Sequence, residues 1–206
     1  MRIALITASP RNESVSRKLL EMLETYLKGH ETAFFSISVY NDLRALAARL
    51  DEYEALVFSL PLYFDGIPSG MLQLMANLEA EHTGTHRVGV IVNCGFHEAE
   101  HASCALKIMH IWADRLGAEW IAGASFGGGP LLEGADPSSA GRGIYKRCGA
   151  VFETFREGLK KSQKDMYVPP VLPRFLYMQA AMYSWRSQIR KNGLTSRDLN
   201  NRLTDE

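Results

Sequence analysis

Ser9-Pro10-Arg11-Asn12-Glu13-Ser14-Val15-Ser16 is the stretch on which the fold and the function of this chain depend. It follows an apolar run, Arg2–Ala8, which is typical of a strand buried on both faces, and it precedes a helical pattern. The start of a helix offers free N–H donors and the positive end of a dipole, which attract phosphate. Serine hydroxyls and the guanidinium of Arg11 add donors for an anion. The stretch indicates a phosphate site, although an ordinary turn with a serine cap would use the same residues.

Length, composition and charge describe a globular chain without a general attraction to nucleic acid. The chain has 206 residues, enough for one good core, and 46% of them are hydrophobic. Its 23 basic and 23 acidic side chains give a net charge of zero, so no nucleic-acid partner is expected. Three cysteines without a C-x-x-C spacing, no signal-peptide pattern and no long apolar run favour a cytoplasmic protein without a membrane partner.

Strand-like and helix-like segments alternate along most of the chain. This alternation predicts an α/β fold, in which a parallel sheet of five strands carries helices on both faces. Such sheets bind ligands at the carboxyl ends of their strands, where the strand order reverses. The loops after the first, third and fourth strands should therefore meet in one crevice. We expect strands at 2–8, 32–39, 55–60, 88–92 and 120–124, and helices at 19–27, 42–50, 69–78, 99–116 and 144–161.

The composition changes in the last part of the chain. The run Val168-Pro169-Pro170-Val171-Leu172-Pro173 predicts a rigid connector, and residues 175–191 have the pattern of one more helix. We therefore expect a domain over residues 1–163, followed over 164–206 by a connector and a helix that packs on that domain or on a partner subunit. A helix on a membrane surface is the alternative, because basic side chains accompany the aromatic ones.

The loops after the third and fourth strands supply two further walls of the expected crevice. Tyr63 and Phe64 lie on a stiff, proline-bounded loop, where an aromatic ring can stack on a flat ligand or pack on the sheet. Asn93 both donates and accepts hydrogen bonds, and Gly95 allows close approach of the backbone. A phosphate cradle, a stiff aromatic wall and a backbone-rich third wall suit a mononucleotide with a planar head, and FMN fits that description.

These residues resemble the flavodoxin-like NADPH-dependent FMN reductase family, which includes related quinone and azo-compound reductases. Ser9-Pro10-Arg11 with Ser14 and Ser16 matches the phosphate loop of that family, G-S-P-R-x-x-S-x-T. Pro61-Leu62-Tyr63 with Ile67-Pro68 resembles its isoalloxazine loop. Asn93-Cys94-Gly95-Phe96 with Glu98 resembles its second flavin loop.

The resemblance implies a fold, a cofactor and an activity. The sheet would have the flavodoxin-like strand order 2-1-3-4-5, and the protein would be an NAD(P)H-dependent FMN oxidoreductase. A hydride would pass from NADH or NADPH through FMN to a small acceptor such as a quinone or free flavin, without a dedicated acid–base side chain. A homodimer or higher oligomer is expected, as in the family. The expected FMN-binding residues are Ser9, Arg11, Ser14, Val15, Ser16, Pro61, Leu62, Tyr63, Phe64, Asn93, Cys94, Gly95 and Phe96.

Three other functions stay open at this point. They are an electron-carrying flavodoxin without NAD(P)H activity, a flavin-free scaffold that binds a partner through its last helix, and a zinc hydrolase. The third depends on His97-Glu98-Ala99-Glu100-His101, an H-E-x-x-H match with Cys104 three residues further on. This match directly follows a strand and a turn instead of lying within a helix, so we assign no metal ligand. Cys94 is expected to be a small buried residue and not a redox sensor.

Overall fold

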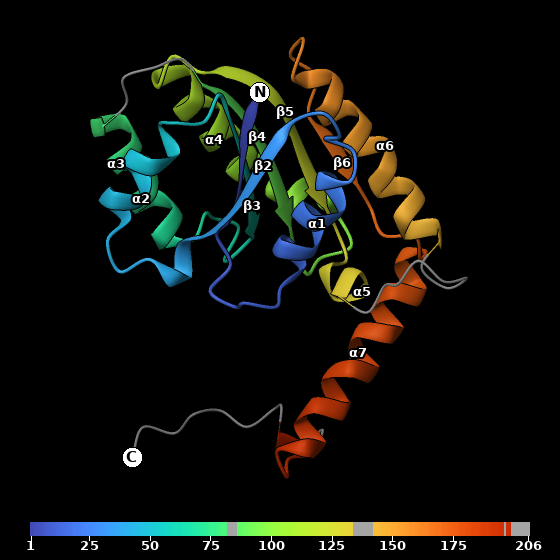
Figure 1. Ribbon diagram of the computed structural model, residues 1–206. Coiled ribbons are helices and arrows are strands. Elements are labelled where there is room, and N and C mark those ends of the chain that lie inside the picture. Colours follow the sequence, from blue (N-terminus) through green and yellow to red (C-terminus); the bar gives the residue numbers. More distant parts are fainter. Residues whose placement is uncertain (82–85, 134–141, 196, 199–206) are drawn as a thin grey trace. The chain divides into compact units, whose positions relative to one another are not determined.

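The structure is a computed structural model that describes residues 1–81, 86–133, 142–195 and 197–198, and the statements below concern these residues (Figure 1). The chain divides into two units, Met1–Pro170 and Val171–Glu206. The first unit is built on a parallel sheet of six strands in the order β2-β1-β3-β4-β5-β6. The strands are β1 (Arg2–Thr7), β2 (Glu31–Ser36), β3 (Ala55–Pro61), β4 (Arg87–Asn93), β5 (Glu119–Phe126) and β6 (Met166–Val168).

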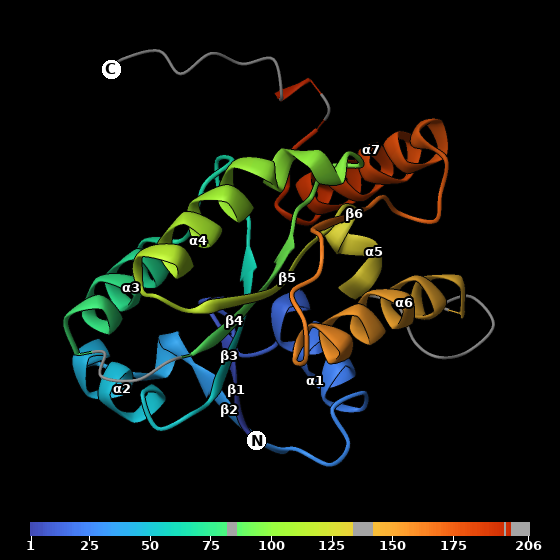
Figure 2. The same cartoon turned by 90° about the horizontal axis from the view of Figure 1, so that it is seen from above.

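Helices cover both faces of this sheet, as Figure 2 shows from above. Alternate side chains of a strand point to opposite faces, so Ala4 and Ile6 join one core while Ile3 and Leu5 join the other. The α/β prediction is therefore confirmed. The first face is covered by α2 (Leu43–Leu50), α3 (Ser69–Glu81) and α4 (Ser103–Arg115), and the second by α1 (Val15–Glu24) and α6 (Arg142–Gly158).

Side-chain caps explain where two of the helices begin. The Oγ of Ser14 accepts a hydrogen bond from the Arg17 N–H at 3.2 Å and caps α1. The Oδ1 of Asp42 accepts from the Arg44 and Ala45 N–H groups at 2.9 and 3.1 Å and caps α2. Each cap satisfies donors that the first turn of a helix leaves without an intrahelical partner.

The sheet has one strand more than the sequence predicted. β6 lies in the segment that we assigned to the connector from residue 164 onward, and it pairs in parallel with β5. Asp165 fixes the start of this strand, because its Oδ1 accepts from Trp120 Nε1 at 2.9 Å and from the Gly123 N–H at 2.8 Å. A strand of three residues is too short to show an alternating pattern. The predicted order is thus correct for five strands and incomplete at the β5 edge.

Short helices account for the other differences from the expected elements. Ile37–Val39, which we expected to continue the second strand, forms a 3₁₀ helix, η1. The helix expected over 99–116 begins as a 3₁₀ helix, η2 (Ala99–Ala102), before α4. A further helix, α5 (Gly129–Glu133), follows β5 where we expected no element. Turns of 3₁₀ type are common beside helices, and hydrophobic spacing does not reveal them.

The second unit contains one long helix, α7 (Arg174–Lys191). It ends at Asn192 and Gly193, where the Leu194 N–H returns to the Ile189 carbonyl at 3.0 Å, a closing bond typical of helix C-termini. Phe175, Tyr183 and Trp185 of this helix are exposed. Among the described residues, α7 included, no helix combines the length and the apolar character that crossing a membrane requires.

Candidate functional site

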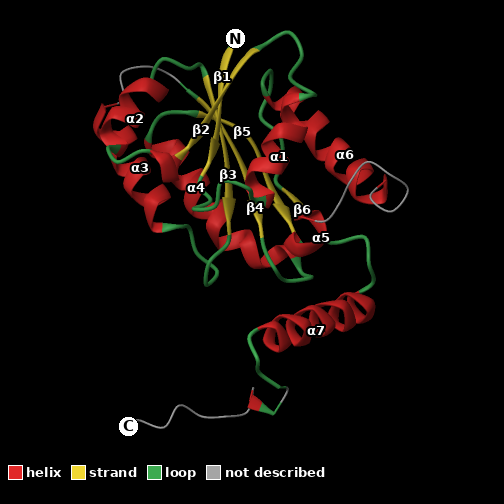
Figure 3. Ribbon diagram, turned by 60° about the horizontal axis from the view of Figure 1, so that its bottom comes forward, coloured by secondary structure: helices red, strands yellow, loops and turns green. Residues whose placement is uncertain are grey.

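The carboxyl ends of β1, β3 and β4 lie side by side at one edge of the sheet, and all strand arrows in Figure 3 point toward that edge. The register places Thr7 opposite Ser59 and Pro61 opposite Asn93. The loops that follow these three strands therefore start from neighbouring positions, as expected for the ligand-binding edge of a doubly wound sheet.

The loop between β1 and α1 is folded by hydrogen bonds to its own serines. The Ser9 N–H donates to Thr7 Oγ1 at 3.3 Å, and the Arg11 N–H donates to Ser9 Oγ at 3.2 Å. Ser14 Oγ accepts from the Arg17 N–H in the same way. Since a hydroxyl has one hydrogen and two acceptor sites, Ser9 and Ser14 each keep a hydrogen to donate to an anion. These two hydroxyls and the α1 N-terminus form a donor set that fits a phosphate.

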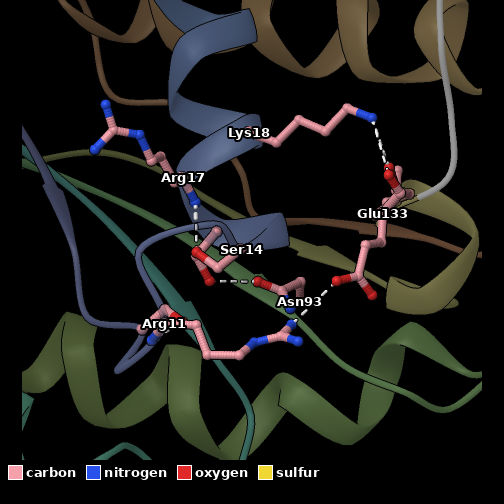
Figure 4. A network of polar contacts seen from close by, with 9 residues as sticks. Arg11, Ser14, Arg17, Lys18, Asn93 and Glu133 are labelled. Atoms are coloured by element: carbon pink, nitrogen blue, oxygen red, sulfur yellow. Dashed lines mark hydrogen bonds and ion pairs between the residues drawn. The ribbon is translucent and has the colours of Figure 1, made fainter.

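Ser16 connects this loop to β4. Its side chain is buried, and its hydroxyl donates to Asn93 Oδ1 at 2.7 Å. Figure 4 shows Asn93 beside the start of α1, in the midst of the polar residues of the loop. The Ser16 hydrogen is thus used within the protein, and Ser16 fixes the orientation of the Asn93 side chain.

One cation and one anion face each other above the loop. Arg11 Nη2 lies 3.4 Å from Glu133 Oε1, and both side chains are more than half exposed (Figure 4). Lys18 Nζ donates to the carbonyl oxygens of Leu132 and Glu133, at 3.0 and 3.3 Å. The lysine therefore holds the end of α5 close to α1, and the carboxylate of Glu133 lies beside the guanidinium of Arg11.

The loop after β3 forms a tight hairpin. Tyr63 and Gly66 exchange backbone hydrogen bonds of 3.2 and 2.9 Å, and the two residues between them, Phe64 and Asp65, have φ angles of +49° and +57°. Positive φ is unusual for residues other than glycine, and here it turns the side chain of Phe64 fully into solvent. The hairpin is tied to the next strand because the Leu62 N–H donates to the Asn93 carbonyl at 2.9 Å.

The loop after β4 is held against the end of β5 by backbone contacts. The Gly128 N–H donates to the Phe96 carbonyl at 2.7 Å, and the Gly129 N–H donates to the Cys94 carbonyl at 2.8 Å. Gly128 has a φ of +71°, which permits the sharp turn into α5. A side chain at Gly127 would overlap the His97 carbonyl oxygen, so the close approach of the two loops requires glycine there.

These loops enclose a cavity of about 290 Å³. This volume lies near the lower end of the range for small-molecule sites, roughly 300–1,000 Å³. Three lining residues, Gly129, Pro130 and Glu133, come from α5 and were not predicted. Ligands bind at the carboxyl ends of the strands in such sheets, and this applies to β5 as well. The run Gly127-Gly128-Gly129-Pro130 after β5 was therefore the signal that could have indicated these residues. The other lining residues are Ser9, Arg11, Ser14, Val15, Ser16, Pro61, Leu62, Tyr63, Asn93, Cys94 and Gly95.

Two aromatic residues of the predicted set lie outside the lining of this cavity. Phe64 is at the tip of the hairpin and is fully exposed. Phe96 is half exposed and stacks on the His101 ring, with centroids 4.2 Å apart. Both side chains lie on loops that border the site, where they present apolar surface to solvent.

The histidines of the H-E-x-x-H match are not arranged on one α-helical face. His97 precedes η2, and His101 lies at the end of that 3₁₀ helix, with its Nδ1 atom 3.6 Å from Asp65 Oδ1. Within residues 1–81, 86–133, 142–195 and 197–198, no three metal-binding side chains form a cluster. The geometry that a zinc hydrolase needs is therefore not present among these residues.

Burial raises the pKa of the Cys94 thiol, which lines the cavity, and the nearby carboxylates of Asp65, Glu98 and Glu100 raise it further. A backbone hydrogen bond with Phe96 acts in the opposite direction with a smaller effect. Burial also raises the pKa of Cys148 to about 12, whereas the side chain of Cys104 is exposed. Cys94 is thus a neutral thiol at neutral pH.

We expect iodoacetamide to modify the exposed Cys104 in the native protein faster than Cys94, and at least about tenfold faster than Cys148. The thiolate is the reactive form, and each unit by which a pKa rises lowers the thiolate fraction about tenfold at neutral pH. Mass spectrometry of tryptic peptides over a time course would give the three rates, with urea-unfolded protein as the control in which the rates converge. Native modification of Cys94 at the rate of Cys104 would contradict the geometry of this loop.

Comparison with families of known proteins gives one match. The family model described as NADPH-dependent FMN reductase matches residues 1–128, which include the loops after β1, β3 and β4 and the whole of β5. Among curated proteins, none matches this chain in sequence.

Solved structures share the fold at low sequence identity. A flavodoxin from Streptococcus pneumoniae TIGR4 superimposes with a TM-score of 0.58 at 13% identity, over 78% of this chain and 98% of that one. An azoreductase from Bacillus anthracis gives 0.55 at 14% identity, over 76% and 99%. An NAD(P)H:quinone oxidoreductase from Methanothermobacter marburgensis gives 0.53 at 17% identity, over 79% and 98%. At these identities the likeness shows a flavodoxin-like fold.

Proposed function

The chain belongs to the NADPH-dependent FMN reductase family, and from this premise we propose that it binds FMN in the cavity at the strand ends and passes electrons from NAD(P)H to a small planar acceptor. Membership of the family gives FMN as the cofactor and NAD(P)H as the electron donor. The residues of FMN binding and the nature of the acceptor are our proposal.

The donor set at the start of α1 supports the phosphate end of this proposal. Ser9 and Ser14 each keep a hydroxyl hydrogen for an anion, and Arg11 lines the same cavity. The N-terminus of α1 adds N–H donors and a favourable dipole, and its first turn contains no acidic residue that would oppose a phosphate. This convergence of donors on one cavity is the observation that carries the proposal.

The neighbouring walls suit the ring of the flavin. Tyr63 is held by the hairpin and Asn93 is held by Ser16, and both residues line the cavity. Gly95 has no atom within 4 Å of the place where a Cβ would stand, so the backbone there is open to a ligand. When bound, FMN supplies the hydride chemistry that links NAD(P)H to an acceptor. The protein binds and orients it, and no acid–base side chain is assigned.

We propose a quinone or free flavin as the acceptor because the border of the site is aromatic and open. Tyr63, Phe64 and Phe96 all expose ring surface next to the cavity or on the loops that border it. Exposed aromatic rings favour stacking with a flat molecule.

An anaerobic titration of FMN-loaded protein with NADH and with NADPH tests this function. We expect loss of the visible flavin absorption with one equivalent of donor and its return when a quinone is added. A protein that binds FMN but is not reduced by either nucleotide would fit an electron carrier without NAD(P)H activity. A protein that does not bind flavin would be neither an FMN-dependent reductase nor a flavin electron carrier.

We also propose a homodimer in the cytoplasm. The exposed Phe175, Tyr183 and Trp185 of α7 support a helix that is covered in an assembly, since large exposed apolar surfaces usually mark contacts. The three free cysteines, two of them buried, suit a reducing compartment. A monomer mass in sedimentation equilibrium at micromolar concentration would refute the dimer.

A further inference from the structure

A carboxylate lines the cavity at the end where we propose that phosphate binds. Glu133 shares the lining with Ser9, Ser14 and Arg11, and its Oε1 lies 3.4 Å from Arg11 Nη2. A site that binds only an anion is expected to be lined by donors and cations. Arg11 is the only arginine among the described lining residues, and the acidic side chain paired with it therefore needs an explanation.

The backbone on both sides of Glu133 fixes its place. At the start of α5, the Gly129 N–H donates to the Cys94 carbonyl at 2.8 Å, and a Cβ on Gly129 would lie 3.1 Å from that oxygen. At the end of α5, Lys18 Nζ donates to two carbonyls, one of them that of Glu133 itself. The other carbonyl belongs to Leu132, whose side chain is buried. Because the backbone is held at both ends, the carboxylate is kept beside the cavity.

The contact between Glu133 and Arg11 contributes little to the stability of the fold. Both side chains are more than half exposed, and ion pairs of this kind contribute ~0–1 kcal/mol. A dianion bound at the same arginine would be repelled by this carboxylate, because the two negative groups would lie at short range. The geometry thus favours a role in ligand affinity over a role in folding.

We propose that Glu133 is a built-in competitor of the flavin phosphate, which occupies Arg11 in the free protein and limits the affinity for FMN. This inference rests on the proposed function. The phosphate of FMN must displace the carboxylate from Arg11 or accept its repulsion. Either way the phosphate binds more weakly than the same donor set would allow, so the cofactor exchanges with free FMN. Glu133 thereby sets how strongly the protein retains its flavin.

Glu133→Gln tests this competition, because glutamine keeps the shape and loses the charge. We expect the Kd for FMN to fall about tenfold, which is the effect of removing one repulsive charge a few ångströms from a phosphate in a partly solvated site. The Kd for riboflavin, which has the same ring and no phosphate, should stay unchanged. Quenching of flavin fluorescence gives both constants for the free protein without any turnover.

Glu21→Gln is the matched control. Glu21 forms an ion pair with Arg17 at 2.8 Å on the surface of α1, so its loss removes one nearby negative charge without touching Arg11. Its FMN affinity should equal that of the parent. An unchanged FMN affinity in Glu133→Gln would overturn the inference, and so would an equal gain for riboflavin. A parent protein that binds neither flavin would overturn the proposed function itself, and with it this inference.

Discussion

FMN should bind about a hundredfold more weakly to the double variant Arg11→Ala/Ser14→Ala, while the fold is retained. Each substitution removes a donor that we assign to the phosphate, and hydrogen bonds to charged groups contribute about 1.5–3 kcal/mol each. Some of this loss is offset because Arg11 must first leave Glu133. Loss of the Ser14 cap also lowers the stability of α1, by about 1 kcal/mol, which a folded domain of this size tolerates.

The measurement is a fluorescence titration with FMN and with riboflavin, accompanied by circular dichroism to confirm the fold. Riboflavin affinity should change little, since the deleted groups face the phosphate only. Arg17→Ala is the control for loss of a nearby arginine, because the Arg17 side chain pairs with Glu21 instead of facing Arg11. If FMN binds the double variant as tightly as the parent, the loop between β1 and α1 is not part of the site.

Gly127→Ala should destabilise the protein by about 3 kcal/mol and weaken FMN binding as well. An added Cβ would overlap the His97 carbonyl oxygen and would lie 3.1 Å from the Phe96 oxygen. These are backbone atoms, so no side-chain rotation relieves the overlap, and forced overpacking costs about 1–3 kcal/mol or more. The shift would also strain the bond from the Gly127 N–H to the Val168 carbonyl, 3.0 Å long, which joins the end of β5 to β6.

Urea denaturation of both proteins measures this loss. Gly95→Ala is the matched control, because that glycine lies in the facing loop after β4 and a Cβ there would meet no atom within 4 Å. We expect its stability to stay within about 0.5 kcal/mol of the parent. If Gly127→Ala were as stable as Gly95→Ala, the loops after β4 and β5 would not be packed as described.

The main architecture was predictable because each element carries its own signal. The buried strands are nearly continuous apolar runs, and Ser14 and Asp42 cap the first two helices with the residues that caps prefer. β6 was missed because it depends on hydrogen bonds from Trp120 and Gly123 to the side chain of Asp165. Both donors lie far from Asp165 in the sequence. A contact of that kind leaves no periodic pattern in a segment of three residues.

The candidate site was also predictable only in part. Residues that follow strand ends, such as Ser9, Tyr63 and Asn93, could be found because topology alone brings them to one edge. The exposure of Phe64 could not be predicted, because it depends on the positive φ angles of Phe64 and Asp65. The glycine of this turn, Gly66, comes only after these two residues. Glu133 was missed because nothing in the sequence shows that α5 folds back onto Arg11.

A crystal structure of the protein grown with excess FMN tests the central claim most directly. We predict that the phosphate will lie at the start of α1, within hydrogen-bond distance of Ser9, Ser14 and Arg11, with the carboxylate of Glu133 moved away from Arg11. The ring should lie beside Tyr63 and Gly95. Flavin bound at another place on the molecule, or a cavity that stays closed by its own side chains at saturating FMN, would contradict the account.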